Sequence, residues 1–140
     1  MKKYHQMQSK SSVEKIDILK RRASRIKKIR KYFEKQNVLE VDTPILSEKA
    51  VSDIHIESIG ATVNNKQNFL HTSPEFCMKR ILAMCSAEIY QICKVFRDHE
   101  KGSLHSPEFT MVEWYRMNFT LQDIINDTCQ LISLLLTNNQ

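Results

Sequence analysis

Glycine is nearly absent from this 140-residue chain, which contains only Gly60 and Gly102. A P-loop and a GxGxxG dinucleotide turn both need several closely spaced glycines, so the sequence contains neither phosphate-binding motif. The four cysteines form no C-x-x-C pair, which argues against a zinc ribbon or a small disulfide framework. We therefore expect reduced thiols that are mostly buried.

Long apolar runs are also missing, because no stretch of about 18 apolar residues is present to cross a membrane. The first residues, MKKYHQMQSK, lack the apolar segment of a secretory signal. We expect a cytoplasmic chain with no membrane partner. Its hydrophobic content of 41% and charged content of 26% are typical of a folded domain with a core.

Positive charge is concentrated near the N-terminus. Residues 1–35 contain 13 Lys and Arg against 3 Asp and Glu, a net charge of +10, whereas residues 36–140 contain 8 against 13, a net charge of −5. Such a basic segment indicates an anionic partner, either RNA or an acidic protein surface. The alternative is a solvated helix face that follows a basic tail.

The first half of the chain predicts one long helix and several short strands. Residues 1–14 are polar and aperiodic, as in a flexible basic tail. Apolar residues then recur every three or four positions from Ile16 to Phe33, which predicts a helix that ends near Asn37. Strands are expected at 38–41, 56–63 and 68–71, with a loop or short helix at 47–55 and a turn at 64–66.

The second half predicts a helix, a long hairpin and a final helix. Pro74 is suited to the first turn of a helix that runs to about Met84. Strands at 89–97 and 109–115 predict an antiparallel hairpin with a polar loop at 98–106. Thr120 and Asp123 form a capping-box pattern at the start of the last helix. This order indicates an α+β fold with a mostly antiparallel sheet.

The hairpin carries the residue types of a binding site. Alternate residues share one face of a strand, so Phe109, Glu113 and Tyr115 lie together, and an acid beside a phenol can bind an ammonium group. Arg97 ends the first strand, where its guanidinium can bind a phosphate through two hydrogen bonds. These residue types also fit a surface charge and a core ring, so the pattern alone leaves both interpretations open.

Longer motifs distinguish these interpretations. The stretch FRDHEKGSLHSPEFTMVEWY at 96–115 resembles motif 2 of the class II aminoacyl-tRNA synthetases, and VLEVDTPIL at 38–46 resembles motif 1 with its proline, Pro44. The stretch LHTSPEFCMKRIL at 70–82 resembles the amino-acid-binding segment of the lysine branch. Within that branch, VSDIHI at 51–56, the Thr72-Ser73 pair and EWYR at 113–116 resemble the elongation factor P–(R)-β-lysine ligases.

The resemblance implies that residues 15–140 form the N-terminal half of a class II catalytic domain, with a mostly antiparallel sheet flanked by helices. The reaction it implies is attack of a lysine or (R)-β-lysine carboxylate on ATP, with Mg²⁺, to form an adenylate for transfer to elongation factor P. The implied roles fall on a short set of residues: Arg97 binds ATP and acts in catalysis, Glu100, His105 and Phe109 also bind ATP, Ser73, Glu75, Glu113 and Tyr115 bind the amino acid, and Pro44 lies at a homodimer interface.

The sequence also departs from the family pattern. The class II pattern places Glu two residues after the motif 2 arginine, where this chain has His99, so either Glu100 replaces it or the adenine contact is weaker. With two glycines, the Gly-rich motif 3 cannot be present, and the metal-binding acids of the second half are missing, so we assign no metal ligand. The alternatives are a fragment of a lysyl-tRNA synthetase, with tRNA as partner, and a non-catalytic module that dimerises or binds RNA.

Overall fold

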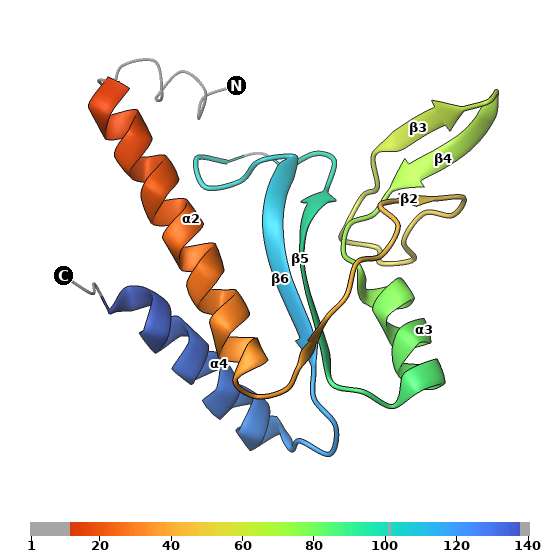
Figure 1. Ribbon diagram of the computed structural model, residues 1–140. Coiled ribbons are helices and arrows are strands. Elements are labelled where there is room, and N and C mark those ends of the chain that lie inside the picture. Colours follow the sequence, from red (N-terminus) through yellow and green to blue (C-terminus); the bar gives the residue numbers. More distant parts are fainter. Residues whose placement is uncertain (1–11, 101, 138–140) are drawn as a thin grey trace. The chain divides into compact units, whose positions relative to one another are not determined.

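The computed structural model describes residues 12–100 and 102–137 (Figure 1). The chain divides into two compact units, one of Met1–Asn37 with Asn118–Gln140 and one of Val38–Met117. Most of the predicted tail, residues 1–11, lies outside the described residues. No helix in the described ranges is both long and apolar enough to cross a membrane.

The first unit pairs two helices, α2 (Ser12–Glu34) and α4 (Leu121–Leu136). The predicted first helix is confirmed, but it begins at Ser12, so residues 12–14 are helical and do not belong to a flexible tail. The Tyr32 hydroxyl of α2 donates to the side chain and to the backbone carbonyl of Asp127 on α4. Lys28 donates to the carbonyls of Leu134 and Thr137 at the C-terminal end of α4, where the last carbonyls have no acceptor role within the helix.

The capping box that the sequence predicts at the start of α4 is confirmed. The Thr120 hydroxyl accepts from the backbone N–H of Asp123 at 3.3 Å, and the Asp123 carboxylate accepts from the backbone N–H of Thr120 at 2.8 Å. Two N–H groups of the first turn are thereby satisfied without help from another element. The same hydrogen bonds with Thr120 lower the pKa of the Asp123 carboxyl group.

The second unit contains two three-stranded sheets. In one sheet, β5 (Ile89–Phe96) lies between β1 (Leu39–Glu40) and β6 (Glu108–Tyr115). In the other sheet, β4 (Lys66–Leu70) lies between β2 (Leu46–Ser47) and β3 (Gly60–Val63). Only β1 and β5 pair in parallel among the described strands, so the mostly antiparallel α+β fold is confirmed.

The small sheet differs in detail from the expectation. The predicted strand 56–63 is regular only in β3, and β2 forms where a loop or short helix was expected. The turn is confirmed, because Asn64 and Asn65 both have positive φ, 50° and 61°, which is the backbone of a type I′ hairpin turn. The helix α3 (Glu75–Cys85) follows β4 directly, with Pro74 as its N-cap rather than its first helical residue.

The predicted antiparallel hairpin of β5 and β6 is confirmed. Gln91 pairs with Glu113, Cys93 with Met111, and Val95 with Phe109, so the chemically interesting side chains of both strands share one face. Ile89 and Val95 of β5 are fully buried, as is Met78 of α3, and together they belong to the core of this unit. A packed strand of this kind holds the side chains beside it in defined positions.

Candidate functional site

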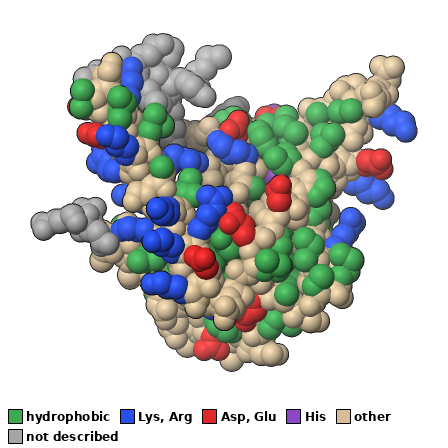
Figure 2. Space-filling model, viewed as in Figure 1, with side chains coloured by type: hydrophobic (Ala, Val, Ile, Leu, Met, Phe, Trp, Pro, Cys, Tyr) green, Lys and Arg blue, Asp and Glu red, His purple; other side chains and the backbone are tan. Residues whose placement is uncertain are grey.

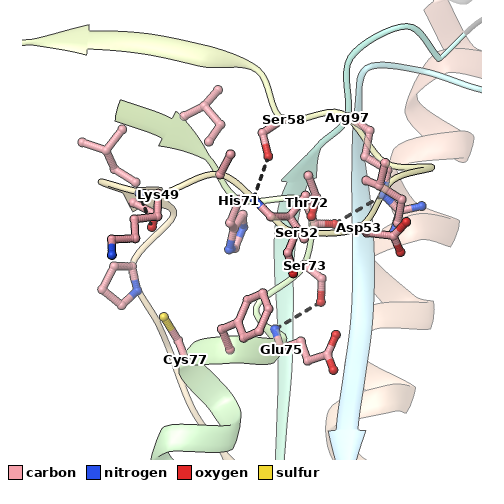
Figure 3. Close-up of a pocket in the computed structure, with 18 of the residues that line it drawn as sticks. Lys49, Ser52, Asp53, Ser58, His71, Thr72, Ser73, Glu75, Cys77 and Arg97 are labelled. Carbon is pink, nitrogen blue, oxygen red and sulfur yellow. Dashed lines mark hydrogen bonds between the residues drawn. The ribbon is translucent and has the colours of Figure 1, made fainter. Parts of the chain in front are cut away.

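A cavity of about 860 Å³ lies within the second unit (Figure 3). One wall is the irregular segment that follows Pro44 and runs to Ser58. The opposite wall consists of the turn between β4 and α3, the first turns of α3, Arg97 just after β5, and Met111 and Glu113 within β6. Five of the sequence-predicted site residues line this cavity, namely Pro44, Ser73, Glu75, Arg97 and Glu113.

Glu113 is the centre of a hydrogen-bonded group in the cavity wall. The Ser73 hydroxyl donates to Glu113 Oε2 at 2.5 Å, and the Tyr115 hydroxyl donates to Glu113 Oε1 at 2.7 Å. Ser73 comes from the β4–α3 turn, whereas Glu113 and Tyr115 are two positions apart on β6. The carboxylate is therefore held by both neighbours in one orientation, which is what a site for a cation needs.

Tyr115 stays a neutral phenol in this arrangement. Burial raises its pKa most, followed by the hydrogen bond to Glu113 and the charges of Glu113 and Glu75. The same surroundings act on Cys93, one strand away, because burial and then the charge of Glu113 raise the pKa of its thiol to about 11. Cys93 is therefore a protonated thiol at neutral pH and not a nucleophile.

Glu75 is the second carboxylate of the cavity. It begins α3, and its backbone N–H donates to the Ser73 hydroxyl at 3.1 Å, so Ser73 serves both the helix start and Glu113. Lys79, one turn later on α3, donates to Glu75 Oε1 at 2.5 Å. Both side chains are about half exposed, so this ion pair is a weak surface interaction that another ammonium group can displace.

Arg97 contributes a positive charge to the same cavity. It follows β5, and its Nε donates to the Thr72 carbonyl at 3.4 Å, which ties the guanidinium to the β4–α3 turn. The guanidinium carbon also lies 5.1 Å from the centre of the Phe109 ring, within the range of a cation–π contact. Phe109 therefore contacts the guanidinium group of Arg97 but does not itself line the cavity.

Glu100 and His105 lie together in the hairpin loop, outside the cavity wall. His105 Nε2 is 3.9 Å from Glu100 Oε2, and a side chain at Gly102 would come within 2.9 Å of His105 Nδ1. His99 has a φ of 55° and turns its ring toward Glu57, with 3.7 Å between His99 Nε2 and Glu57 Oε2. The side chains of these two neighbours have different partners, Glu57 for His99 and His105 for Glu100, and Glu100 is the more buried of the two.

Sequence reasoning missed several residues of the cavity wall, among them Lys49, Ser52, Asp53, His71 and Arg80. Figure 3 shows Asp53 and Ser52 on the segment that faces Ser73 and Arg97. The VSDIHI string at 51–56 contains two of these residues, and its resemblance to the ligases was the available signal. His71 lies in the LHTSPEFCMKRIL stretch at 70–82, which resembles the amino-acid-binding segment of the lysine branch. Its Nε2 lies 2.7 Å from the Lys94 carbonyl and must donate to it, because a carbonyl only accepts.

Pro44 also lines the cavity and is exposed. The residue before it, Thr43, is buried, and its hydroxyl donates to the Gln91 side-chain oxygen at 3.0 Å. This bond joins the motif 1 segment to β5. Within residues 12–100 and 102–137, no group of three or more His, Cys, Asp or Glu side chains is arranged to hold a metal ion.

Comparisons with known proteins show the family of the chain. Residues 2–139 match the sequence model of a protein family described as tRNA synthetases class II (D, K and N). The chain is 46% identical over 121 residues to the elongation factor P–(R)-β-lysine ligase of Mannheimia succiniciproducens, covering 82% of this chain and 38% of that protein. It is 48% identical over 115 residues to the ligase of the same name from Vibrio atlanticus, covering 78% and 36%. The resemblance predicted from the motifs is therefore confirmed.

A solved structure extends the comparison to the fold. The crystal structure of asparaginyl-tRNA synthetase from Pyrococcus horikoshii, complexed with asparaginyl-adenylate, matches with a TM-score of 0.76. The match covers 84% of this chain and 27% of that one, at 22% sequence identity, and it shows the fold alone. The chain spans well under half the length of the curated relatives it matches, 38% in the Mannheimia succiniciproducens and Photobacterium profundum ligases.

Proposed function

The chain belongs to the class II tRNA synthetases of the D, K and N type, and from this premise we propose that it takes part in ATP-dependent activation of lysine or (R)-β-lysine for transfer to elongation factor P. The relatives that are 43–48% identical are named elongation factor P–(R)-β-lysine ligases, which favours this acceptor over tRNA. Those relatives are much longer than this chain, so their activity, substrates and partners are proposed for it.

The observation that carries the proposal is the charge arrangement of the cavity. Carboxylates and cations both line it: Glu75, Glu113 and Arg97 are joined there by Glu48, Asp53, Lys49 and Arg80. Lysine and (R)-β-lysine each carry two ammonium groups and one carboxylate, so Glu75 and Glu113 can accept the ammonium groups while Arg97 binds the carboxylate. Ser73 and Tyr115 hold Glu113 in position, and a preformed charged acceptor binds an ammonium group without first having to be ordered.

The proposed reaction needs charge neutralisation and positioning more than a nucleophilic side chain. A carboxylate oxygen of the amino acid attacks the α-phosphorus of ATP, the bond from that phosphorus to the pyrophosphate oxygen breaks, and an adenylate and pyrophosphate form. Arg97 would contact both reacting anions and reduce their mutual repulsion. The amine of an acceptor lysine then attacks the carbonyl carbon, and AMP leaves.

The ATP part of the site rests on the same arginine and its neighbours. Arg97 covers one face of the Phe109 ring, so an adenine base would stack on the other face. Glu100 and His105, paired in the hairpin loop, would lie near the base and the phosphates. Mg²⁺ accompanies ATP in the proposal, but the described residues offer no ligand set for it, so no step is assigned to the metal.

The proposed assembly is a homodimer with the motif 1 segment at its interface. Pro44 is exposed at the end of this segment, and the bond from Thr43 to Gln91 holds the segment against β5. An interface here would border the cavity, because Pro44 also lines it.

The test is ATP–pyrophosphate exchange by the purified chain with lysine, (R)-β-lysine, norleucine or no amino acid. Norleucine has the carbon chain of lysine without the side-chain ammonium, so it is a matched control for the second carboxylate. Exchange that depends on lysine or (R)-β-lysine and fails with norleucine supports the proposal. A folded chain that binds the diamines in calorimetry but does not exchange refutes activation by this chain, and one that does not bind them refutes the site itself.

A further inference from the structure

A second hollow, of about 510 Å³, lies in the first unit. Lysines dominate it: Lys27, Lys28 and Lys31 of α2 and Lys35 just after the helix, with Ser24 beside them and Leu134 from α4. Figure 2 shows Lys and Arg side chains gathered over α2. We call this hollow the lysine groove. It lies in a different compact unit from the cavity described above.

Positive charge in the lysine groove is not neutralised by its own surroundings. No residue that lines the groove is acidic. Lys28 donates to carbonyls at the end of α4, whereas no ion pair joins Lys27, Lys31 or Lys35 to an acid in the part of the chain that the structure describes. Three exposed ammonium groups therefore face solvent within one hollow.

The spacing of these three lysines favours one kind of anion. Lys27 and Lys31 lie one turn apart on α2, and Lys35 follows the last residue of the helix, where its backbone N–H still donates to the Lys31 carbonyl at 3.2 Å. The three lysines therefore form a row at intervals of about 6 Å. A nucleic acid strand carries a phosphate at every nucleotide, whereas a folded protein surface carries carboxylates only where Asp or Glu occurs. Lysine binds a phosphate as a point charge without a fixed geometry, which suits contact with a backbone.

We propose that the lysine groove binds the phosphate backbone of a single nucleic acid strand without reading its sequence. Lys27, Lys31 and Lys35 contact successive phosphates, and the Ser24 hydroxyl is available as a further donor. The groove contains no Arg, Asn or Gln, whose planar groups form two parallel hydrogen bonds to a base edge. This role is separate from amino-acid activation and does not depend on it.

Fluorescence anisotropy with a labelled single-stranded RNA of mixed sequence tests the proposal on the full chain. Three phosphate contacts predict that log K falls with log salt at a slope of about −2, since each contact to a single strand contributes about −0.7. Lys31→Gln with Lys35→Gln reduces the slope to about −0.7 and weakens binding about 25-fold at 0.1 M salt by the same relation. Lys31→Arg with Lys35→Arg keeps the charge and preserves binding.

A matched variant separates the groove from net charge. Lys66→Gln with Lys94→Gln removes the same charge from two exposed residues of the second unit, and it leaves RNA affinity within about threefold. Equal losses in the two charge-removing variants would show that binding is non-specific and would overturn the groove assignment. Polyglutamate that binds the groove more tightly than the RNA at equal charge would also overturn it, because the partner would then be an acidic protein.

Discussion

Glu113→Gln is the substitution that tests the amino-acid site most directly. The carboxylate accepts one hydrogen bond from Ser73 at 2.5 Å and one from Tyr115 at 2.7 Å. Glutamine keeps the size and one acceptor oxygen, but its amide nitrogen must donate, so one of the two hydroxyls has to rotate and accept. The fold should be retained, whereas the negative charge that would hold a substrate ammonium is lost.

The magnitude follows from the type of bond removed. A hydrogen bond to a charged group contributes about 1.5–3 kcal/mol, so the Glu113→Gln chain should bind lysine or (R)-β-lysine about 10- to 150-fold more weakly. The pKa of Tyr115 should move down toward its ordinary value, because the hydrogen bond and the charge of Glu113 both raise it while burial is unchanged. Two independent readouts thus report on one carboxylate.

The assay is titration calorimetry with the diamine, beside ultraviolet titration of tyrosinate. Glu108→Gln is the matched control, because Glu108 lies on the same strand, is half exposed and pairs only with Lys94 at the surface. It should leave diamine affinity unchanged. If Glu113→Gln binds the diamine within about threefold of the unsubstituted chain, Glu113 does not hold the substrate ammonium and our assignment is wrong.

The remaining predictions concern catalysis, stability and pH. Arg97→Ala should abolish ATP–pyrophosphate exchange with an unchanged circular dichroism spectrum, and exchange within about threefold would refute its role at the phosphate. Lys79→Met should strengthen diamine binding about twofold in calorimetry, since an exposed helical ion pair with Glu75 is worth only about 0.3–0.5 kcal/mol; weaker binding would contradict competition. Thr120→Ala should lower the free energy of unfolding by about 1 kcal/mol in urea titrations, because the cap of α4 is lost. The pKa of the Cys93 thiol in the folded chain is about 11, above its ordinary 9.0. The stability that this difference contributes is complete below pH 9 and is lost as pH rises through 11. Cys93→Ser should remove this loss from urea titrations at several pH values.

Local features of the fold were predictable because the residues that decide them are neighbours in the chain. Alternation along 109–115 indicated which side chains share a face, and the register of β5 with β6 confirmed it. Thr120 with Asp123 specified a helix start, and two successive asparagines specified the tight turn between β3 and β4. Each of these patterns acts over two to four residues, where backbone geometry leaves few alternatives.

Pairings between distant segments were not predictable in this way. β1 and β2 are only two residues long. The sequence predicted a strand at 38–41, where β1 forms, but it predicted neither the partner of β1 nor the existence of β2. Their partners, β5 and β4, are chosen by packing and by main-chain hydrogen bonds that any sequence can form. In the strand predicted at 56–63, residues 56–59 are irregular, because the pairing of β3 with β4 begins at Gly60.

For the candidate site, the sequence by itself determined the chemistry: two carboxylates, a phenol, a serine and an arginine, in motifs that belong to one family. Only the tertiary structure decided which of them meet. Ser73 reaches Glu113 across 40 positions of chain, Arg97 turns its guanidinium onto Phe109, and Asp53 lies in a wall that no local pattern assigned to the site. Side-chain types follow from the sequence directly, whereas contacts between distant residues exist only once strands and turns are packed together.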